Sequence, residues 1–131
     1  MDYYIGDAMR SRGIDLSKEQ FIVLKYLNES DGRKQNDLAF ITNRSKTALT
    51  RLINTMEKKD LVSRSNCEKD MRINHIYLTP SGREIWAKAY PFFLEIIEEL
   101  QQGISEEEIL MVQGVMKQIQ KNINLKTTVN Q

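Results

Sequence analysis

Ala48 to Arg64 reads Ala-Leu-Thr-Arg-Leu-Ile-Asn-Thr-Met-Glu-Lys-Lys-Asp-Leu-Val-Ser-Arg, and His75 to Gly82 reads His-Ile-Tyr-Leu-Thr-Pro-Ser-Gly. The first segment repeats apolar side chains at helical spacing, which predicts an amphipathic helix that buries Ala48, Leu49, Leu52, Ile53 and Met56. The runs 61–64 and 75–78 are β-rich and are separated by a polar loop, which is typical of a hairpin. We therefore expect a helix followed by a two-stranded hairpin with a charged tip.

The other faces of this helix carry basic, hydroxyl and amide side chains, namely Lys46, Thr47, Thr50, Arg51 and Asn54. A helix fits the major groove of DNA, and a hairpin beside it can reach the neighbouring minor groove. The pattern therefore predicts a DNA-binding surface.

The net charge of +1 hides an uneven distribution along the chain. Residues 33–77 contain ten Lys or Arg against five Asp or Glu, a net charge of +5, and the remainder contains nine basic against thirteen acidic residues, a net charge of −4. A basic middle between acidic ends is expected if only the middle meets an anionic partner. The alternative is an accidental asymmetry of a solvated surface.

Length and composition favour one ordinary globular domain. The chain has 131 residues, of which 40% are hydrophobic and 28% are charged. It contains no apolar run of about 18 residues that would predict a membrane span, and no basic-then-apolar N-terminal segment that would predict a signal peptide. Its single cysteine excludes an intrachain disulfide and fits a reducing cytosol. We therefore expect a cytoplasmic protein without a membrane partner.

Three helices are predicted ahead of the central helix. The first covers residues 2–12, the second begins at the capping box Ser17-x-x-Gln20, and the third covers residues 35–41. The N-cap of the central helix is either Ser45 or Asn43.

Two longer helices are predicted after the hairpin. Thr79-Pro80 has the pattern of an N-cap followed by proline at the first helical position, which begins a helix to about residue 101. Ser105-x-x-Glu108 is a second capping box and begins a helix to about residue 124. Pro80 and Pro91 are both interpreted as boundaries of elements. The predicted fold class is α+β, mainly α, with a winged helix-turn-helix core and additional N- and C-terminal helices.

Short motifs follow one another through the middle of the chain: Gln20-Phe21 with Leu24 and Leu27, Gln35-x-x-Leu38-Ala39, Leu49-Thr50-Arg51-Leu52, Met56-Glu57-Lys58-Lys59-x-Leu61-Val62-x-Arg64, Asp70-x-Arg72, and Leu78-Thr79-x-x-Gly82. In this order and at this spacing they resemble the MarR family of winged helix-turn-helix transcriptional regulators. Asp60 stands where glycine is common in the family, and Asp tolerates the left-handed conformation of a helix cap.

The resemblance implies one MarR-like domain over residues 1–131, with a winged-helix core at about 17–80 and dimerisation helices at about 1–13 and 85–128. It implies a cytoplasmic homodimer, usually a repressor, that binds a pseudo-palindromic operator in double-stranded DNA. Family members are often released from DNA by oxidation or by a small lipophilic or phenolic effector. No cofactor is expected.

In the family, the helix that corresponds to residues 45–59 enters the major groove. The residues that we expect to contact DNA there are Arg44, Ser45, Lys46, Thr47, Thr50, Arg51 and Asn54. The first two, at the start of the helix, are placed for phosphate contacts. Arg51 or Lys46 is expected to donate to guanine, and Thr47 or Thr50 to contact a thymine methyl group or a phosphate.

The hairpin, or wing, contributes Arg64, Lys69, Asp70 and Arg72. By analogy with the family, Arg72 enters the minor groove, where groove width and negative potential supply part of the preference. Asp70 either holds Arg72 in that position or braces the hairpin through the same ion pair. The alternative is that Asp70 and Arg72 form an ion pair that is purely structural and does not contact DNA.

One wing-and-helix unit covers too few base pairs for tight specific binding, so a dimer is expected, with recognition helices roughly 34 Å apart. Two apolar stripes offer an interface: Phe92, Phe93, Ile96, Ile97 and Leu100, and Val112, Val115, Met116, Ile119 and Ile123. In the alternative, these side chains pack within the core of a single chain, and some of them must do so in either case.

Other candidate sites are less specific. Tyr26, Trp86 and Tyr90 are candidates to line an effector crevice, although aromatic side chains at helical spacing more often belong to a core. Cys67, in the wing loop, is either a redox-sensitive thiol or an incidental one. His75 is interpreted as structural, and one Cys with one His is too few for a metal site of the usual kind.

Two other classes of function fit the sequence less well. A winged-helix module that binds protein instead of DNA would have an acidic or apolar recognition face, whereas this face carries Lys46, Thr47, Thr50 and Arg51. An enzyme is disfavoured because the sequence contains neither a Gly-rich phosphate loop nor a nucleophile motif.

Overall fold

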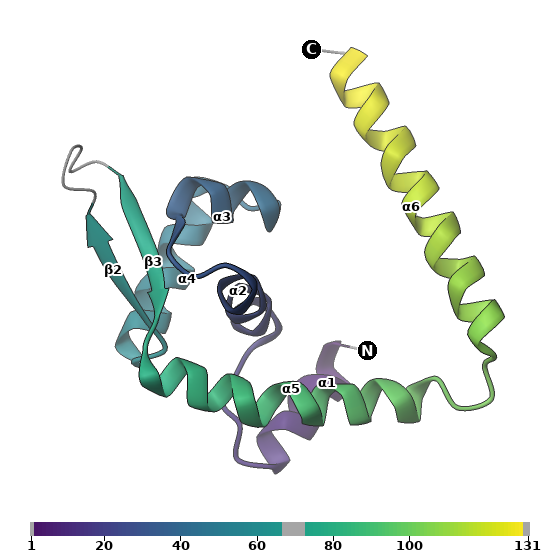
Figure 1. The fold of residues 1–131 in the computed structure, drawn as a ribbon, viewed down its shortest axis with the longest axis horizontal. Coiled ribbons are helices and arrows are strands. Elements are labelled where there is room, and N and C mark those ends of the chain that lie inside the picture. Colours follow the sequence, from purple (N-terminus) through teal and green to yellow (C-terminus); the bar gives the residue numbers. More distant parts are fainter. Residues whose placement is uncertain (1, 67–72, 130–131) are drawn as a thin grey trace. The chain divides into compact units, whose positions relative to one another are not determined.

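The computed structural model describes residues 2–66 and 73–129. The helices are α1 (Asp2–Ser11), α2 (Lys18–Glu29), α3 (Gln35–Ile41), α4 (Lys46–Lys58), α5 (Pro80–Leu100) and α6 (Glu106–Val129), and the strands are β1 (Arg33–Lys34), β2 (Val62–Asn66) and β3 (Asn74–Leu78). The chain divides into two compact units, Met1–Ile96 and Ile97–Gln131. This architecture confirms the predicted α+β, mainly helical, winged-helix fold (Figure 1).

The helices begin at the capping residues that the sequence predicts. In α2 the Ser17 hydroxyl accepts from the Gln20 N–H, and the Gln20 side-chain oxygen accepts from the Ser17 N–H at 3.1 Å, so both halves of the capping box are present. The Ser45 hydroxyl accepts from the Ala48 N–H at 3.1 Å, which makes Ser45 the N-cap of α4. Asn43 instead lies in the tight turn between α3 and α4, with φ +55°.

The sheet has three antiparallel strands in the order β1-β3-β2, and Figure 1 shows the hairpin of β2 and β3. Arg64 of β2 and Arg33 of β1 both pair with Ile76 of the central strand β3. Strand β1 was not predicted, because a run of two residues is too short to show an alternating pattern. Its addition joins the hairpin to the segment between α2 and α3, so that the base of the wing is held from both sides.

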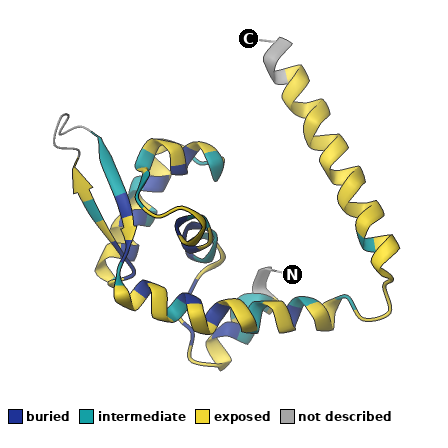
Figure 2. Ribbon diagram, in the orientation of Figure 1, coloured by how far each residue is buried: buried dark blue, intermediate teal, exposed yellow. Residues whose placement is uncertain are grey.

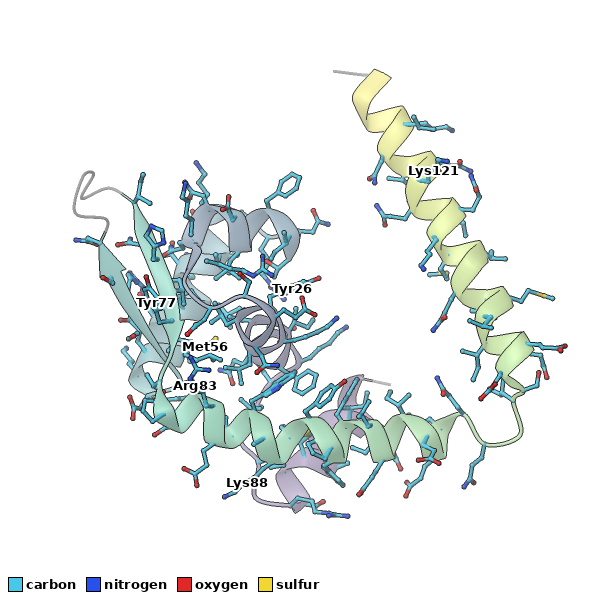
Figure 3. The ribbon with its side chains drawn as sticks, viewed as in Figure 1. Tyr26, Met56, Tyr77, Arg83, Lys88 and Lys121 are labelled. Atoms are coloured by element: carbon cyan, nitrogen blue, oxygen red, sulfur yellow. The ribbon has the colours of Figure 1, made fainter. Side chains whose placement is uncertain are left out.

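The core of the first unit lies where α2, α3 and α4 meet the sheet and the start of α5. Its largest fully buried side chains are Val23, Leu24, Leu27, Leu38, Leu49, Ile53, Met56 and Ile76. Figure 3 shows Met56 among the side chains between α4 and α5. Three members come from α4 alone, so α4 is attached to the core along one face and its opposite face is left to solvent.

The connection from α4 to β2 packs directly on the start of α5. Asp60 has φ +58°, the left-handed conformation expected from its position after the helix. The Thr79 hydroxyl donates to the Asp60 carbonyl at 2.5 Å, and the Thr79 N–H donates to the Leu61 carbonyl at 3.2 Å. Gly82, the next turn of α5, is buried against Leu61. The angle at which β2 leaves α4 is thereby held by α5.

Three local expectations were wrong. Pro91 lies inside α5 and not at a boundary: proline removes one N–H from the helical ladder, and the helix continues through it from Pro80 to Leu100. Ala48 is exposed, because it lies at the edge of the apolar face of α4. Helix α6 extends to Val129, beyond the expected end near residue 124.

The two predicted apolar stripes differ in burial. In α5, Phe92 and Phe93 pack against the core of their own chain, and Ile96 is buried, so packing within the chain accounts for most of this stripe. In α6 the members of the second stripe, Val112, Val115, Met116, Ile119 and Ile123, are all exposed. Figure 2 shows α6 exposed along nearly its whole described length. Among the described helices, none is both long and apolar enough to cross a membrane.

Candidate nucleic-acid interface

The outer face of α4 presents the side chains that the sequence predicts for a groove-reading helix. Leu49, Ile53 and Met56 point into the core, so Lys46, Thr47 and Arg51 project on the other side and are exposed. The first turn of α4 contains no acidic residue, which leaves the positive end of the helix dipole uncompensated. This end of the helix is therefore suited to an anion such as a phosphate.

Arg44, just before the helix, is partly buried. Its guanidinium lies 3.8 Å from the carboxylate of Glu19 in the first turn of α2. An ion pair at this degree of exposure contributes little to stability, so the pair can open toward a stronger anion at small cost. Ser45 and Arg44 thus occupy the predicted phosphate-contact positions at the start of α4.

The hydroxyl of Thr50 is already engaged. It donates to the Lys46 carbonyl at 2.8 Å and accepts from the Gln35 side-chain amide, at the start of α3, at 2.9 Å. Because a hydroxyl has one hydrogen, Thr50 has none left to donate to a phosphate. The other predicted role, contact of its methyl group with a thymine methyl, stays a prediction. Gln35 was not predicted as part of the interface, although it belongs to the Gln35-x-x-Leu38 motif.

Asn54 and Arg64 are brought together by the fold. The Arg64 guanidinium donates to the Asn54 side-chain oxygen at 2.6 Å and lies 3.0 Å from the carboxylate of Glu57. Two residues expected to contact DNA therefore contact each other, and Glu57 joins them. Sequence reasoning missed this cluster, because the pattern of one helix does not reveal which strand residue reaches it.

The far end of α4 is tied to the segment before α2. The Lys59 ammonium donates to the Asp15 carbonyl at 2.6 Å and to the Gln20 side-chain oxygen at 3.0 Å. Gln20 is buried and uses the same oxygen in the capping box of α2. Lys59 is thus a structural cation of the α4 terminus, and its charge is partly compensated by the Asp15 carboxylate at 3.4 Å.

The remaining wing residues, Lys69, Asp70 and Arg72, and also Cys67, lie outside the described residues. The described part of the wing consists of β2 and β3, which form a continuous antiparallel ladder from Val62↔Leu78 to Asn66↔Asn74. The predicted roles of the four residues stay predictions.

The aromatic candidates for an effector crevice separate into two environments. Trp86 stacks on Tyr90 with ring centroids 5.0 Å apart and contacts Phe21 at 5.1 Å, and it is 8% exposed. Tyr26, labelled in Figure 3, lies beside cations, with the Arg33 guanidinium 5.7 Å from its ring centre. The contacts of Trp86 are those of a packed core side chain.

His75 has a structural contact. Its Nδ1 lies 3.0 Å from the Gly32 carbonyl and so joins β3 to the turn before β1. Within residues 2–66 and 73–129, no three His, Cys, Asp or Glu side chains are grouped so that they could hold a metal ion.

Comparison with known proteins gives consistent results. The family model described as "MarR family" matches residues 16–73. The transcriptional regulator HosA of Escherichia coli O157:H7 is 33% identical over 104 residues, which cover 79% of this chain and 77% of that protein. The crystal structure of AbsC, a MarR family transcriptional regulator from Streptomyces coelicolor, superposes with a TM-score of 0.83 at 27% identity, covering 94% of this chain and 84% of AbsC. A crystal structure of an S. aureus MepR–DNA complex superposes equally well, with a TM-score of 0.83 at 26% identity over 94% of this chain and 89% of MepR.

Proposed function

The chain belongs to the MarR family of transcriptional regulators, and on this premise we propose that it acts as a homodimeric repressor that binds a pseudo-palindromic operator in double-stranded DNA. The observation that carries the proposal is the exposed basic and hydroxyl face of α4, opposite its three buried apolar residues. The solved DNA complex of a relative with the same fold supports it. The relatives named above are transcriptional regulators and not enzymes, and we propose a cytoplasmic location.

In the proposed complex, α4 lies in the major groove. Arg51, which projects from the middle of the exposed face, donates to the O6 and N7 atoms of guanine. Lys46 and Thr47 contact the groove nearer the helix start, and Thr50 offers its methyl group to thymine. Arg44 and Ser45 bind phosphate, where Arg44 exchanges Glu19 for the DNA backbone.

The wing is proposed to reach the minor groove with Arg72, with Lys69 and Asp70 beside it. Support comes from the motif Asp70-x-Arg72 and from the ladder of β2 and β3, which directs the hairpin away from the core. A narrow minor groove concentrates negative potential, which favours an arginine there.

We propose that the winged-helix core, about residues 17–80, binds DNA and that residues of about 1–13 and 85–128 form the dimer. The exposed apolar stripe of α6 supports this division, because a water-exposed stripe of this length is normally covered by a partner. A symmetric dimer would bury the stripe against its own copy and place two α4 helices on one face of DNA. An effector that binds near Tyr26, Trp86 and Tyr90 is part of the same proposal.

The direct test uses purified full-length protein to select fragments from the source genome, followed by mobility-shift assays on the recovered sequences. A two-fold symmetric site bound in a salt-sensitive manner is the expected result. Absence of any selected sequence, together with binding to a protein partner, would favour the interaction-module alternative.

Replacing Arg51 with alanine is expected to weaken binding to the selected site by about 1–3 kcal/mol, roughly 5- to 150-fold, because a two-point contact with guanine is lost. The loss should be much smaller on random DNA. Lys88→Ala is the matched control, since Lys88 is an exposed cation on α5 (Figure 3) and its removal should leave affinity nearly unchanged. An equal loss on both DNAs would assign Arg51 to phosphate contact only.

Replacing Arg72 with alanine is expected to weaken binding and to reduce the slope of log K against log salt by about 0.9, the value for one lost phosphate-region cation. Affinity is measured at several salt concentrations on the same operator. An affinity and slope equal to those of the wild type would exclude a minor-groove role for Arg72.

A further inference from the structure

We infer that Glu57 is a positioning residue of the DNA interface: through Arg64 it fixes the first wing strand to the recognition helix. The inference rests on the proposed DNA-binding function. It changes the assignment of Arg64 and Asn54, which the sequence places among the DNA contacts, to parts of a brace between α4 and β2. This Glu57–Arg64–Asn54 cluster is called the wing brace below.

The geometry of the wing brace joins two elements through one guanidinium. Asn54 and Glu57 are three residues apart on α4 and therefore lie on the same side of that helix. Arg64 reaches both from the middle of β2, at 2.6 Å and 3.0 Å, and its own backbone is paired with Ile76 of the central strand. A rotation of β2 relative to α4 would break these contacts together.

Burial indicates that Arg64 faces the protein more than the solvent. Its side chain is 23% exposed, and its Nε is buried without a hydrogen-bond partner among the described residues. A phosphate-binding arginine would be expected to extend its guanidinium outward. Here one guanidinium nitrogen, Nη2, contacts both the amide oxygen of Asn54 and the carboxylate of Glu57, so the charged end of Arg64 is directed at α4.

The charge of Glu57 provides an independent argument. It is the only acidic residue of α4, a helix that also carries Lys46, Arg51 and Lys58. A carboxylate near a polyanion opposes binding by charge alone. Glu57 would repel the DNA phosphates. Its position beside the wing is explained if holding the wing in place strengthens DNA binding more than this repulsion weakens it. A preformed angle between helix and wing lowers the ordering cost when both enter their grooves.

The two effects of Glu57 on DNA binding have opposite signs, which makes the inference testable. Glu57→Gln removes a negative charge, so electrostatics alone predict tighter binding. Loss of the brace predicts weaker binding by up to about fivefold, the upper end for a partly exposed ion pair. Asp37→Asn is the matched control, because it removes one acidic charge from the neighbouring helix α3 outside the brace. Its affinity should equal or slightly exceed that of the wild type.

Arg64→Gln separates a brace from a phosphate contact. A positioning role predicts weaker binding with the salt slope of the wild type, and the double variant Glu57→Gln/Arg64→Gln should bind no worse than Arg64→Gln alone. A slope reduced by about 0.9 and additive losses would make Arg64 a phosphate contact. Glu57→Gln binding as tightly as the wild type, or more tightly, would overturn the inference.

Amide hydrogen exchange of the DNA-free protein gives a readout that does not depend on operator binding. Glu57→Gln is expected to increase exchange in residues 62–66 and 74–78 while the buried amides of α2 keep their protection. Unchanged exchange in the hairpin would contradict the brace. If the wild-type protein binds no DNA, the proposed function fails, while the exchange experiment still decides whether Glu57 holds the wing.

Discussion

Replacing Gly82 with alanine is expected to lower the free energy of unfolding by about 3 kcal/mol, the upper range for overpacking a well-fitted site. A Cβ built on Gly82 would lie 2.1 Å from the Leu61 carbonyl oxygen and 3.0 Å from its carbon. The obstacle is backbone, so rotation of a side chain cannot relieve it. Leu61 must move, and with it the hydrogen bond from the Thr79 N–H that joins α5 to the start of β2.

The measurement is chemical or thermal unfolding of the full chain at one fixed protein concentration, since dimerisation makes apparent stability concentration-dependent. Gly114→Ala is the control, because an added Cβ there meets nothing within 4 Å. In the middle of α6 this change should stabilise by about 1 kcal/mol through helix propensity. Equal effects of the two substitutions would contradict the close approach of α5 to Leu61.

Replacing Ile119 with glutamate is expected to convert the dimer to a monomer and to reduce operator affinity by at least about 100-fold. Ile119 is 48% exposed in the single chain and lies in the middle of the α6 stripe. In a two-fold symmetric interface, one substitution introduces two carboxylates, and an unpaired buried charge costs several kcal/mol. A monomer retains one recognition helix and loses the second half-site.

Light scattering gives the mass, and a mobility-shift assay gives the affinity. Lys121→Glu is a strict control, because it changes the charge by a larger amount at a residue labelled on α6 in Figure 3. Lys121 follows Ile119 by two residues, which places it on the opposite side of a helix with about 3.6 residues per turn. This substitution should leave the mass of the dimer unchanged. An Ile119→Glu protein that stays dimeric would place the interface elsewhere, and a dilute wild-type sample that is a folded monomer would exclude the proposed dimer.

The features predicted correctly from the sequence are those set by residues three or four positions apart. The capping boxes at Ser17 and Ser105 both form, and Ser45 and Thr79 accept hydrogen bonds from the first turns of α4 and α5. The buried face of α4 follows its apolar spacing at Leu49, Ile53 and Met56. These signals, with the family motifs, are sufficient for the fold class and for locating the exposed face of the recognition helix.

Assigning roles to the side chains on that face required contacts between distant parts of the chain. Thr50 and Asn54 have the same outward position in the sequence pattern as Arg51, yet Gln35 engages the first and Arg64 the second. The partners are 15 and 10 residues away. No helical or strand period relates residues at such separations, so the sequence pattern cannot distinguish a groove-reading side chain from a bracing one.

The central stretch from Ala48 to Gly82 therefore contains two levels of information. Local spacing and capping specify a helix, a hairpin and the start of another helix, because those preferences act within one turn or one strand pair. The angle between helix and wing depends on Arg64 reaching Glu57, on β1 pairing with β3, and on Gly82 seating against Leu61. These contacts form only when the chain has folded, since each joins segments that no local preference connects.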